Sequence, residues 1–292
     1  FEMDLLRRTA AGELSALFGK IALDVDKRHR LHRMRARVAA NLDAIAGDKR
    51  AVLDAYVAGA NAGVDALAVR PWPYLLLRQR PAPWTTADTP LAGIAMYFDL
   101  QDAANARELA LWRMQPHLPA PLFALLTRDG TRWDAPLQGE PRGDAILPDA
   151  AQLDLRTLPA PDGKPQALER TKGTPGSNNF AVAGSLTADG RAIVANDMHL
   201  GLRAPNLWFR VRLRYADPQA PNGRVDVQGV SLPGLPAIIV GSNGHVAWGF
   251  TNSYGDYLDW QRQRPCADAA VAGCTPVVRH RETIAVAGGE PV

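Results

Sequence analysis

The sequence predicts an α+β protein with a helical front half and a strand-rich back half. Over about the first 125 residues, apolar side chains recur at helical spacing, whereas after Ser177 the period changes to two. Between these halves lies a stretch rich in Pro, Gly and Asp, and its second part, residues 145–176, is expected to be a surface linker. These observations divide the chain into 1–144, 145–176 and 177–292.

The helical half shows the 3.6-residue period in three places, each with a signal for where the helix starts or stops. Helices are expected over 5–18 with Gly19 as C-cap, over 48–67, and from an N-cap at Thr85 or Thr86 to Leu111.

The most basic run, residues 27–37, also reads as helical. Leu31, Met34 and Val38 form an apolar stripe along it, so its arginines are expected to be the solvated face of an amphipathic helix. A nucleic-acid site would need a larger net charge than +3 and interleaved aromatic residues, which this run lacks.

In the back half, alternation and turn signals predict a series of short strands. Phe209, Val211, Leu213 and Tyr215 alternate with polar residues, which is typical of a strand with one buried face. Asp-Gly and Asn-Gly pairs separate the strands as in hairpins. Strands are expected at 179–183, 192–196, 207–215, 225–230, 237–240 and 246–251.

Composition excludes several classes of function. There is no P-loop or dinucleotide fingerprint, so no organic cofactor is expected. No stretch approaches the roughly 18 apolar residues that membrane insertion needs. Cys266 and Cys274 are eight apart and are compatible with a disulfide or with two free thiols. The chain starts at Phe1 without a leader and ends at Val292 in strand-rich sequence, so we expect it to be part of a longer protein.

The dipeptide Gly176-Ser177 stands between the linker and the first strand. Cleavage of this bond would leave Ser177 as a chain terminus with a hydroxyl and a free α-amine. Such a residue carries a nucleophile and a base together, because an α-amine titrates near ~7.7–8.0. The structural alternative is an ordinary β-turn serine.

Three other features have both a functional and a structural interpretation. His199 follows a predicted strand and is either a catalytic base or a structural hydrogen-bonding residue. The small-residue segment 241–252 presents backbone N–H groups to an oxyanion or is a buried strand. Asp256 and Asp259 either chelate a hard cation or are solvated.

Four motifs, taken in order, closely resemble the penicillin acylase family, which also contains N-acyl-homoserine lactone acylases. The front half is similar to the α-chain of that family, through Phe1–Arg8 and Gly12–Gly19. The four motifs are Gly176-Ser177-Asn178-Asn179-Phe180-Ala181-Val182, Asn196-Asp197-Met198-His199-Leu200, Leu232-Pro233-Gly234-Leu235-Pro236 and Gly241-Ser242-Asn243-Gly244-His245-Val246-Ala247-Trp248-Gly249.

The resemblance implies an N-terminal-nucleophile (Ntn) hydrolase with a four-layer αββα core. It implies one precursor, exported to the bacterial periplasm and cut into an α-chain and a β-chain. Ser177 matches the nucleophile and Gly176 the other side of the cut. His199 matches a residue beside the nucleophile, and Asn252 the residue whose backbone N–H forms half of the oxyanion hole. The other half is an Asn side chain beyond this sequence.

The family also binds a structural calcium ion. Glu108 matches the carboxylate ligand of the α-chain, Asp256 and Asp259 match two further carboxylate ligands, and Leu258 matches a backbone-carbonyl ligand. The resemblance therefore implies calcium as the only cofactor.

The resemblance places the acyl pocket in part. Leu200 and Val240 stand where the penicillin G branch has Phe, and Met96, Tyr97 and Leu100 come from the helical half. Aliphatic walls favour an acyl group different from that of penicillin G.

The expected function is that of an acylase which cuts itself at Gly176–Ser177. Ser177 then hydrolyses the N-acyl amide bond of a small molecule through an acyl-enzyme. The chain on its own is expected to be nearly inactive because it lacks the second oxyanion donor. The alternative is an uncut, non-catalytic member of the family that binds amides or peptides.

Overall fold

The computed structural model describes residues 1–292 except 102–104, 137, 158–175, 203, 253–256 and 267–273. These residues form two compact units. The first unit comprises Phe1–Ala103, Pro175–Gly255 and Pro265–Val292, and the second comprises Ala104–Thr174 and Asp256–Arg264. Helices and antiparallel sheets are both present, so the predicted α+β class is confirmed. Much of the expected linker, residues 158–175, lies outside the described residues.

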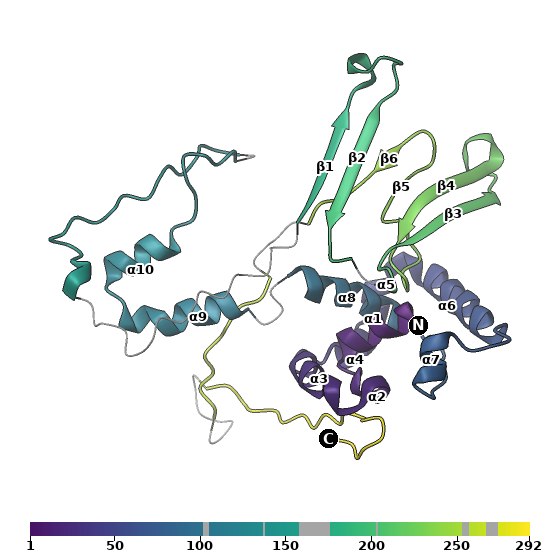
Figure 1. The fold of residues 1–292 in the computed structure, drawn as a ribbon, viewed down its shortest axis with the longest axis horizontal. Helices are drawn as coiled ribbons and strands as arrows, with labels where there is room; N and C mark the ends of the chain where they lie inside the picture. Colours follow the sequence, from purple (N-terminus) through teal and green to yellow (C-terminus); the bar gives the residue numbers. More distant parts are fainter. Residues whose placement is uncertain (102–104, 137, 158–175, 203, 253–256, 267–273) are drawn as a thin grey trace. The chain divides into compact units, whose positions relative to one another are not determined.

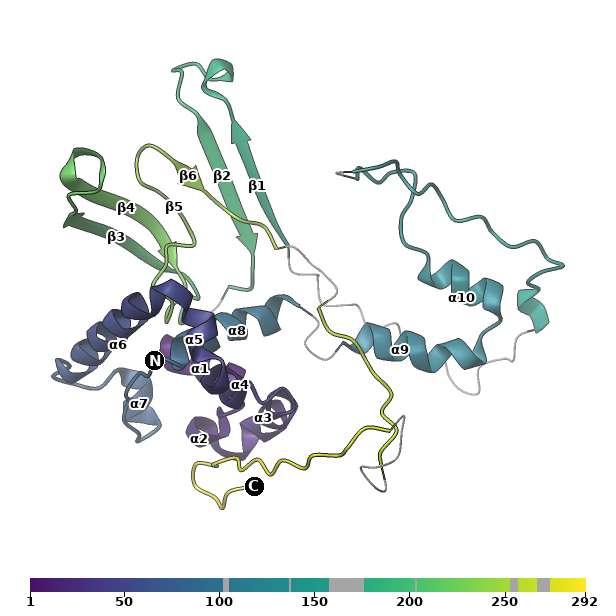
Figure 2. The same cartoon turned by 180° about the vertical axis from the view of Figure 1, so that it is seen from behind.

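The helices precede the strands in the chain, as expected (Figure 1). The second unit contains α9 and α10, seen from behind in Figure 2. The helices are α1 (Glu2–Ala11), α2 (Ser15–Phe18), α3 (Leu23–Arg30), α4 (Met34–Ala40), α5 (Leu42–Ala46), α6 (Arg50–Asp65), α7 (Trp72–Leu76), α8 (Asp88–Leu100), α9 (Ala106–Met114) and α10 (Ala120–Thr127).

The strands form two antiparallel sheets in the first unit (Figure 1). A hairpin pairs β1 with β2, and a second sheet has the order β3-β4-β5-β6. All six predicted strand positions are occupied, with shifted ends. The strands are β1 (Gly176–Val182), β2 (Ile193–His199), β3 (Phe209–Ala216), β4 (Arg224–Ser231), β5 (Val240–Ser242) and β6 (Ala247–Trp248).

The helix predicted over 5–18 is interrupted at Gly12. This glycine has a φ of 66°, and its N–H caps the last carbonyls of α1. A Cβ here would lie 2.8 Å from the Asp26 carbonyl oxygen, so α1 ends where the chain passes close to α3. Gly19 is the C-cap of α2, as predicted.

The helix predicted from Thr85 or Thr86 to Leu111 is wrong at its start and in its length. No side chain caps α8 at Ala87. Instead, the N–H and Oγ of Thr85 donate to the Asp88 carboxylate at 2.8 and 2.7 Å. The helix stops at Leu100, and the chain becomes helical again at Ala106.

The basic run also differs from its prediction. It divides into α3 and α4 at residues 31–33, and Leu31 is 81% exposed instead of joining an apolar stripe. Arg30 and Arg33 pair with Glu282 at 2.8 and 3.0 Å. The expected solvated face is therefore partly an ion-paired face, because acidic groups remote in sequence fold against it.

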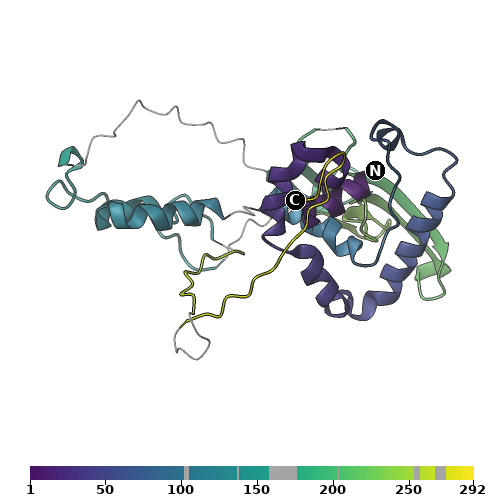
Figure 3. The same cartoon turned by 90° about the horizontal axis from the view of Figure 1, so that it is seen from below.

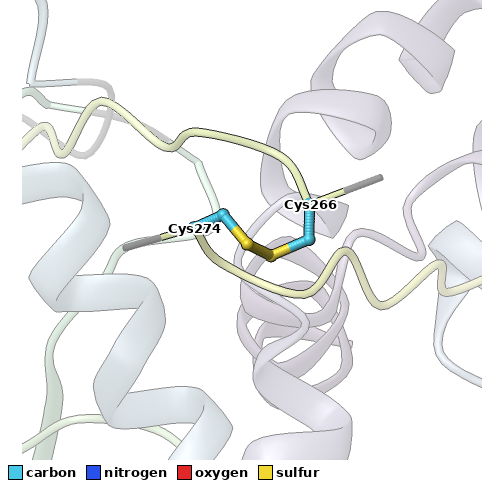
Figure 4. Close-up of a disulfide and its surroundings, with 2 residues drawn as sticks. All are labelled: Cys266 and Cys274. Carbon is cyan, nitrogen blue, oxygen red and sulfur yellow. A yellow bond between two sulfur atoms is a disulfide. The ribbon is translucent and has the colours of Figure 1, made fainter. Parts of the chain in front are cut away.

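The carboxyl-terminal segment crosses the helices of the first unit (Figure 3). The N–H of Ala287 donates to the Ser15 carbonyl at 2.8 Å, and Ile284 and Val286 are buried. Earlier in the same segment, Cys266 and Cys274 form a disulfide with a Cα–Cα distance of 5.1 Å (Figure 4). The two alternatives for the cysteines are thus decided in favour of the bond.

The prediction that the strand at 207–215 has one buried face is wrong. Phe209, Leu213 and Tyr215 alternate along β3 as expected, but they are 62%, 47% and 54% exposed. These three side chains on the predicted buried face are therefore exposed, and only Val211 between them is half-buried. The buried core lies instead among α1, α4, α8 and two loops of the back half, with Leu6, Ala10, Val38, Leu91, Ala92, Leu207 and Leu232 among its members.

Arg7 makes the central polar contacts of the helical half. Its guanidinium is buried and donates to Asp4 and Asp88, each at 2.8 Å. It also donates to the carbonyls of Ala82 and Pro83 and lies 5.0 Å from the centre of the Trp84 ring. One side chain therefore connects α1, the loop before α8, and α8 itself.

The two acidic partners are held in the ionised form. Burial alone would raise the pKa of Asp4, but the hydrogen bond from Tyr74 and the nearby arginines outweigh it and lower the pKa. Burial opposes ionisation of Asp88 as well, yet Arg7 and Thr85 lower its pKa. Both carboxylates therefore stay charged, and the nearby arginines balance their charge.

We predict that Arg7→Met lowers the free energy of unfolding of the full-length protein by about 3 kcal/mol at pH 7, since two buried carboxylates lose their shared partner. The folded-state pKa of both carboxyls lies below the unfolded value of about 3.9. Their contribution is therefore complete above that pH and is lost as the pH falls through the lower folded values. The difference between parent and variant should shrink accordingly in acid.

Denaturant unfolding at several pH values measures this effect. Arg191→Met is the control, because Arg191 pairs with Asp189 at the exposed surface. Equal losses in the two variants would contradict a central role for Arg7.

Candidate active site

Ser177 lies at the start of the β1–β2 hairpin. The register pairs Gly176 with His199, Ser177 with Met198 and Asn178 with Asp197. Facing residues of an antiparallel pair share a side of the sheet, and neighbours along a strand alternate. Ser177 therefore shares one face of the hairpin with Asn179 and Asn196, whereas Asn178, Asp197 and His199 share the other.

The segment after β6 lies against the Ser177 face. The backbone N–H of Asn252 donates to Ser177 Oγ at 3.0 Å. The side chain of Asn196 donates to the Phe250 carbonyl at 3.1 Å. Gly249 permits this close approach, because a Cβ there would lie 3.0 Å from the Cβ of Asn196. A backbone donor is thereby fixed beside a serine hydroxyl.

The carboxyl-terminal end of α8 contacts Asn252, the residue whose N–H lies beside Ser177. The Nε2 of Gln101 donates to the Asn252 Oδ1 at 3.0 Å, and the Asn252 Nδ2 donates to the Leu100 carbonyl at 3.4 Å. Sequence reasoning missed Gln101, because no local pattern links it to a residue so far along the chain. Its position just after a helix end is the only signal that the sequence offers.

His199 takes part in a separate cluster on the other face of the hairpin. Its Nε2 lies 3.2 Å from an oxygen of Asp197 and 3.3 Å from the Asn178 side chain. The other Asp197 oxygen accepts the backbone N–H of Asn178 at 3.0 Å. The bond with His199 and those with Asn178 lower the pKa of Asp197. His199 is beside Ser177 in register, but the polar contacts that the structure describes for it are with these groups and not with Ser177.

A hollow of about 630 Å³ opens beside the serine. It is lined by Ser177, Phe180, Asn196 and Thr251, together with their neighbours on the hairpin. This space is large enough for part of a small-molecule substrate and reaches Ser177 directly.

None of the five residues predicted for the acyl pocket is among those that line this hollow. Met96 and Leu200 pack against the hydrophobic core, and Tyr97 lies beside Phe98 with ring centres 5.9 Å apart. Val240 pairs with Val230 between β5 and β4. Leu100 contributes its carbonyl to Asn252, as described above.

The calcium ligands predicted from the sequence belong to the second unit and are described separately. The Asn105 side-chain amide contacts both the Glu108 carboxylate and the Leu258 carbonyl. The other Glu108 oxygen accepts the N–H of Trp260 at 3.3 Å. The Glu108 carboxylate and the Leu258 carbonyl, two of the predicted calcium ligands, therefore lie around the same amide group. Oxygen ligands of this kind suit a hard cation. Asp256 lies outside the described residues, and Asp259 is exposed.

The described residues contain neither a cluster of metal-binding side chains nor a membrane-spanning helix. No three His, Cys, Asp or Glu side chains gather there as a metal-binding group. Among the same residues, no helix is both long and apolar enough to cross a bilayer.

We predict that Gly249→Ala slows the hydrolysis and the chain cleavage that the sequence leads us to expect of Ser177 by about tenfold, because the added Cβ displaces the Asn252 donor by a few tenths of an ångström. Gly201→Ala is the matched control, since no atom lies within 4 Å of a Cβ at that position. The rates of both reactions are measured in the full-length protein. Equal rates in the two variants would contradict the prediction.

The chain is also similar in sequence to known proteins. The family described as Penicillin amidase matches residues 1–292. The chain is 31% identical over 301 residues to the penicillin acylase 2 proenzyme of Pseudomonas sp. (strain SE83), with 99% of this chain and 37% of that protein covered.

The chain is also 28% identical over 298 residues to the acyl-homoserine lactone acylase QuiP of Pseudomonas fluorescens (strain Pf0-1), with 100% of this chain and 35% of that protein covered. A shorter match, 34% over 103 residues, is to the acyl-homoserine lactone acylase PvdQ of Pseudomonas syringae pv. tomato (strain ATCC BAA-871 / DC3000), with 35% of this chain and 12% of that protein covered. The chain spans little more than a third of the length of the first two relatives. Because the family matches it from end to end, this chain belongs to the penicillin amidase family.

Proposed function

We propose that the protein containing this chain is an acylase that uses Ser177 as its nucleophile. The observation that carries this proposal is the backbone N–H of Asn252, fixed 3.0 Å from Ser177 Oγ. When Ser177 Oγ bonds to a carbonyl carbon, the oxygen on that carbon comes within reach of the same N–H donor. The names of the relatives support N-acyl amides as the substrate class. We also propose that the complete protein has the αββα sandwich of Ntn hydrolases.

The first stage of the proposed mechanism is cleavage of the chain. Ser177 Oγ attacks the Gly176 carbonyl carbon, the Gly176–Ser177 peptide bond breaks, and the hydroxyl proton passes to the departing nitrogen, which leaves an ester and a free α-amine. Water then hydrolyses the ester, which releases the Gly176 carboxylate. Ser177 becomes the first residue of a second chain, and the amine needed for catalysis is created in the same step.

In the second stage, Ser177 acts on the substrate. Its α-amine takes the hydroxyl proton as Oγ attacks the amide carbonyl carbon, and the Asn252 N–H donates to the developing oxyanion. The C–N bond breaks, the proton passes to the leaving amine, and an acyl ester of Ser177 remains. Water hydrolyses this ester to the free acid.

We propose a structural calcium ion in the second unit, held by the Glu108 carboxylate and the Leu258 carbonyl, with Asp256 and Asp259 as further ligands. Bound there, the ion would join the first turn of α9 to residues 256–259. No step of the acyl transfer passes through it.

A chelator should therefore lower the melting temperature of the full-length protein, and added calcium should restore it. Glu108→Gln should weaken this response, whereas Glu140→Gln, at an exposed position, should leave it unchanged. A melting temperature unaffected by the chelator would remove calcium from the proposal.

The acyl group and the location of the protein are further parts of the proposal. Hydrolysis of acyl-homoserine lactones of varied chain length, compared with phenylacetyl amides, separates the two activities that the relatives' names suggest. The Cys266–Cys274 disulfide suits an oxidising compartment and supports the periplasm, which cell fractionation tests.

Intact mass under denaturing conditions tests the nucleophile. The full-length parent should appear as two chains, the second beginning at Ser177, whereas Ser177→Ala should remain one chain without turnover. Ser185→Ala, at an exposed position a few residues along the chain, is the control and should be cut normally. A parent that stays in one piece would instead favour the amide-binding alternative.

A further inference from the structure

We infer that Gln101 is a positioning residue for the oxyanion-binding amide of Asn252. The inference rests on the proposed function of Ser177 and extends it to a residue of the helical half. Gln101 comes directly after α8, and its Nε2 donates to the Asn252 Oδ1 at 3.0 Å. The two residues are 151 positions apart, so tertiary structure alone brings them together.

The Asn252 side chain is fastened at both ends of its amide. Gln101 holds the oxygen, and the Leu100 carbonyl accepts a bond from the nitrogen at 3.4 Å. A planar amide bound on both sides cannot rotate without losing both bonds. The side chain of Asn252 therefore restricts the backbone to which it is attached, and it is the backbone N–H that faces Ser177 Oγ.

Such restriction matters because an oxyanion donor acts by being in place before charge develops. Residues 249–252 have no regular secondary structure, so their position depends on contacts with other elements. Phe250 is held by Asn196 of the hairpin. Asn252, which bears the donor, is held by the end of α8, and Gln101 supplies the shorter of the two bonds.

The same contact would couple the two chains of the cleaved protein. Gln101 lies before the proposed cut at Gly176–Ser177 and Asn252 lies after it. The helical chain would then contribute directly to the geometry of a site whose reacting atoms belong to the other chain.

Kinetics of the full-length protein test the role. Gln101→Met keeps the length of the side chain and removes the donor. We expect kcat to fall by about tenfold with KM within twofold of the parent, for whichever of phenylacetyl p-nitroanilide and N-decanoyl-homoserine lactone the parent hydrolyses. Gln228→Met, at an exposed position on β4, should match the parent. A raised KM with unchanged kcat would overturn the inference, because it would make Gln101 a substrate contact.

A double-mutant cycle separates positioning from general loss of structure. Asn252→Ala keeps the backbone N–H and removes the side chain that Gln101 holds. If Gln101 acts through Asn252, the double variant should be no slower than the slower single variant. Multiplied losses in the double variant would overturn the inference.

Hydrogen exchange of the Asn252 amide gives a readout that does not need turnover. It should be faster in Gln101→Met than in the parent and unchanged in Gln228→Met; equal exchange in all three would overturn the inference. Faster exchange together with an uncut parent would overturn the proposed function alone. If Gln101→Met does not fold, Gln101→Glu, which keeps the shape but cannot donate when ionised, carries the same expectations.

Discussion

The buried guanidinium of Arg7 is the interaction on which the helical half depends. It meets Asp4 on its own helix and Asp88 at the start of α8, and it binds the carbonyls of the loop that enters α8. A buried charge is tolerated only where its donors and acceptors are matched. The two carboxylates provide that match, with Tyr74, Thr85 and further arginines supplying their other bonds. The orientation of α8 is therefore set by electrostatics as well as by apolar packing around Leu91.

This constraint continues along α8 to the candidate active site. The helix starts at the Arg7 network and ends at Leu100, where its last carbonyl and the next side chain meet Asn252. Asn252 in turn faces Ser177 through its backbone N–H. The bonds from Gln101 to Asn252 and from Asn252 to Ser177 are both 3.0 Å long, and the bond from Asn252 to the Leu100 carbonyl is longer, at 3.4 Å. Together they connect a buried ion pair to a serine hydroxyl through one rigid helix.

The described polar groups around Ser177 on its face of the hairpin are neutral rather than charged. On the Ser177 face, the polar groups that the structure describes include backbone groups and the neutral side chains of Asn179, Asn196 and Asn252. The ionisable pair of Asp197 and His199 lies on the other face of the hairpin. Among the described residues, no charged side chain is hydrogen-bonded to Ser177 on that face to take its proton. An α-amine created by cleavage would supply the missing base at the nucleophile itself, which is why cleavage and catalysis belong to one proposal.

The order and type of the elements could be predicted from the sequence, because hydrophobic period and turn chemistry are local properties. The change of period after Ser177 marked the passage from helices to strands, and the asparagine- and glycine-rich motifs marked the segments around the candidate site. The tertiary structure was needed to show that Gly12 ends α1 against Asp26, that Arg30 and Arg33 pair with Glu282, and that Gln101 reaches Asn252. These outcomes depend on which residues meet across long stretches of chain, and no local period records that.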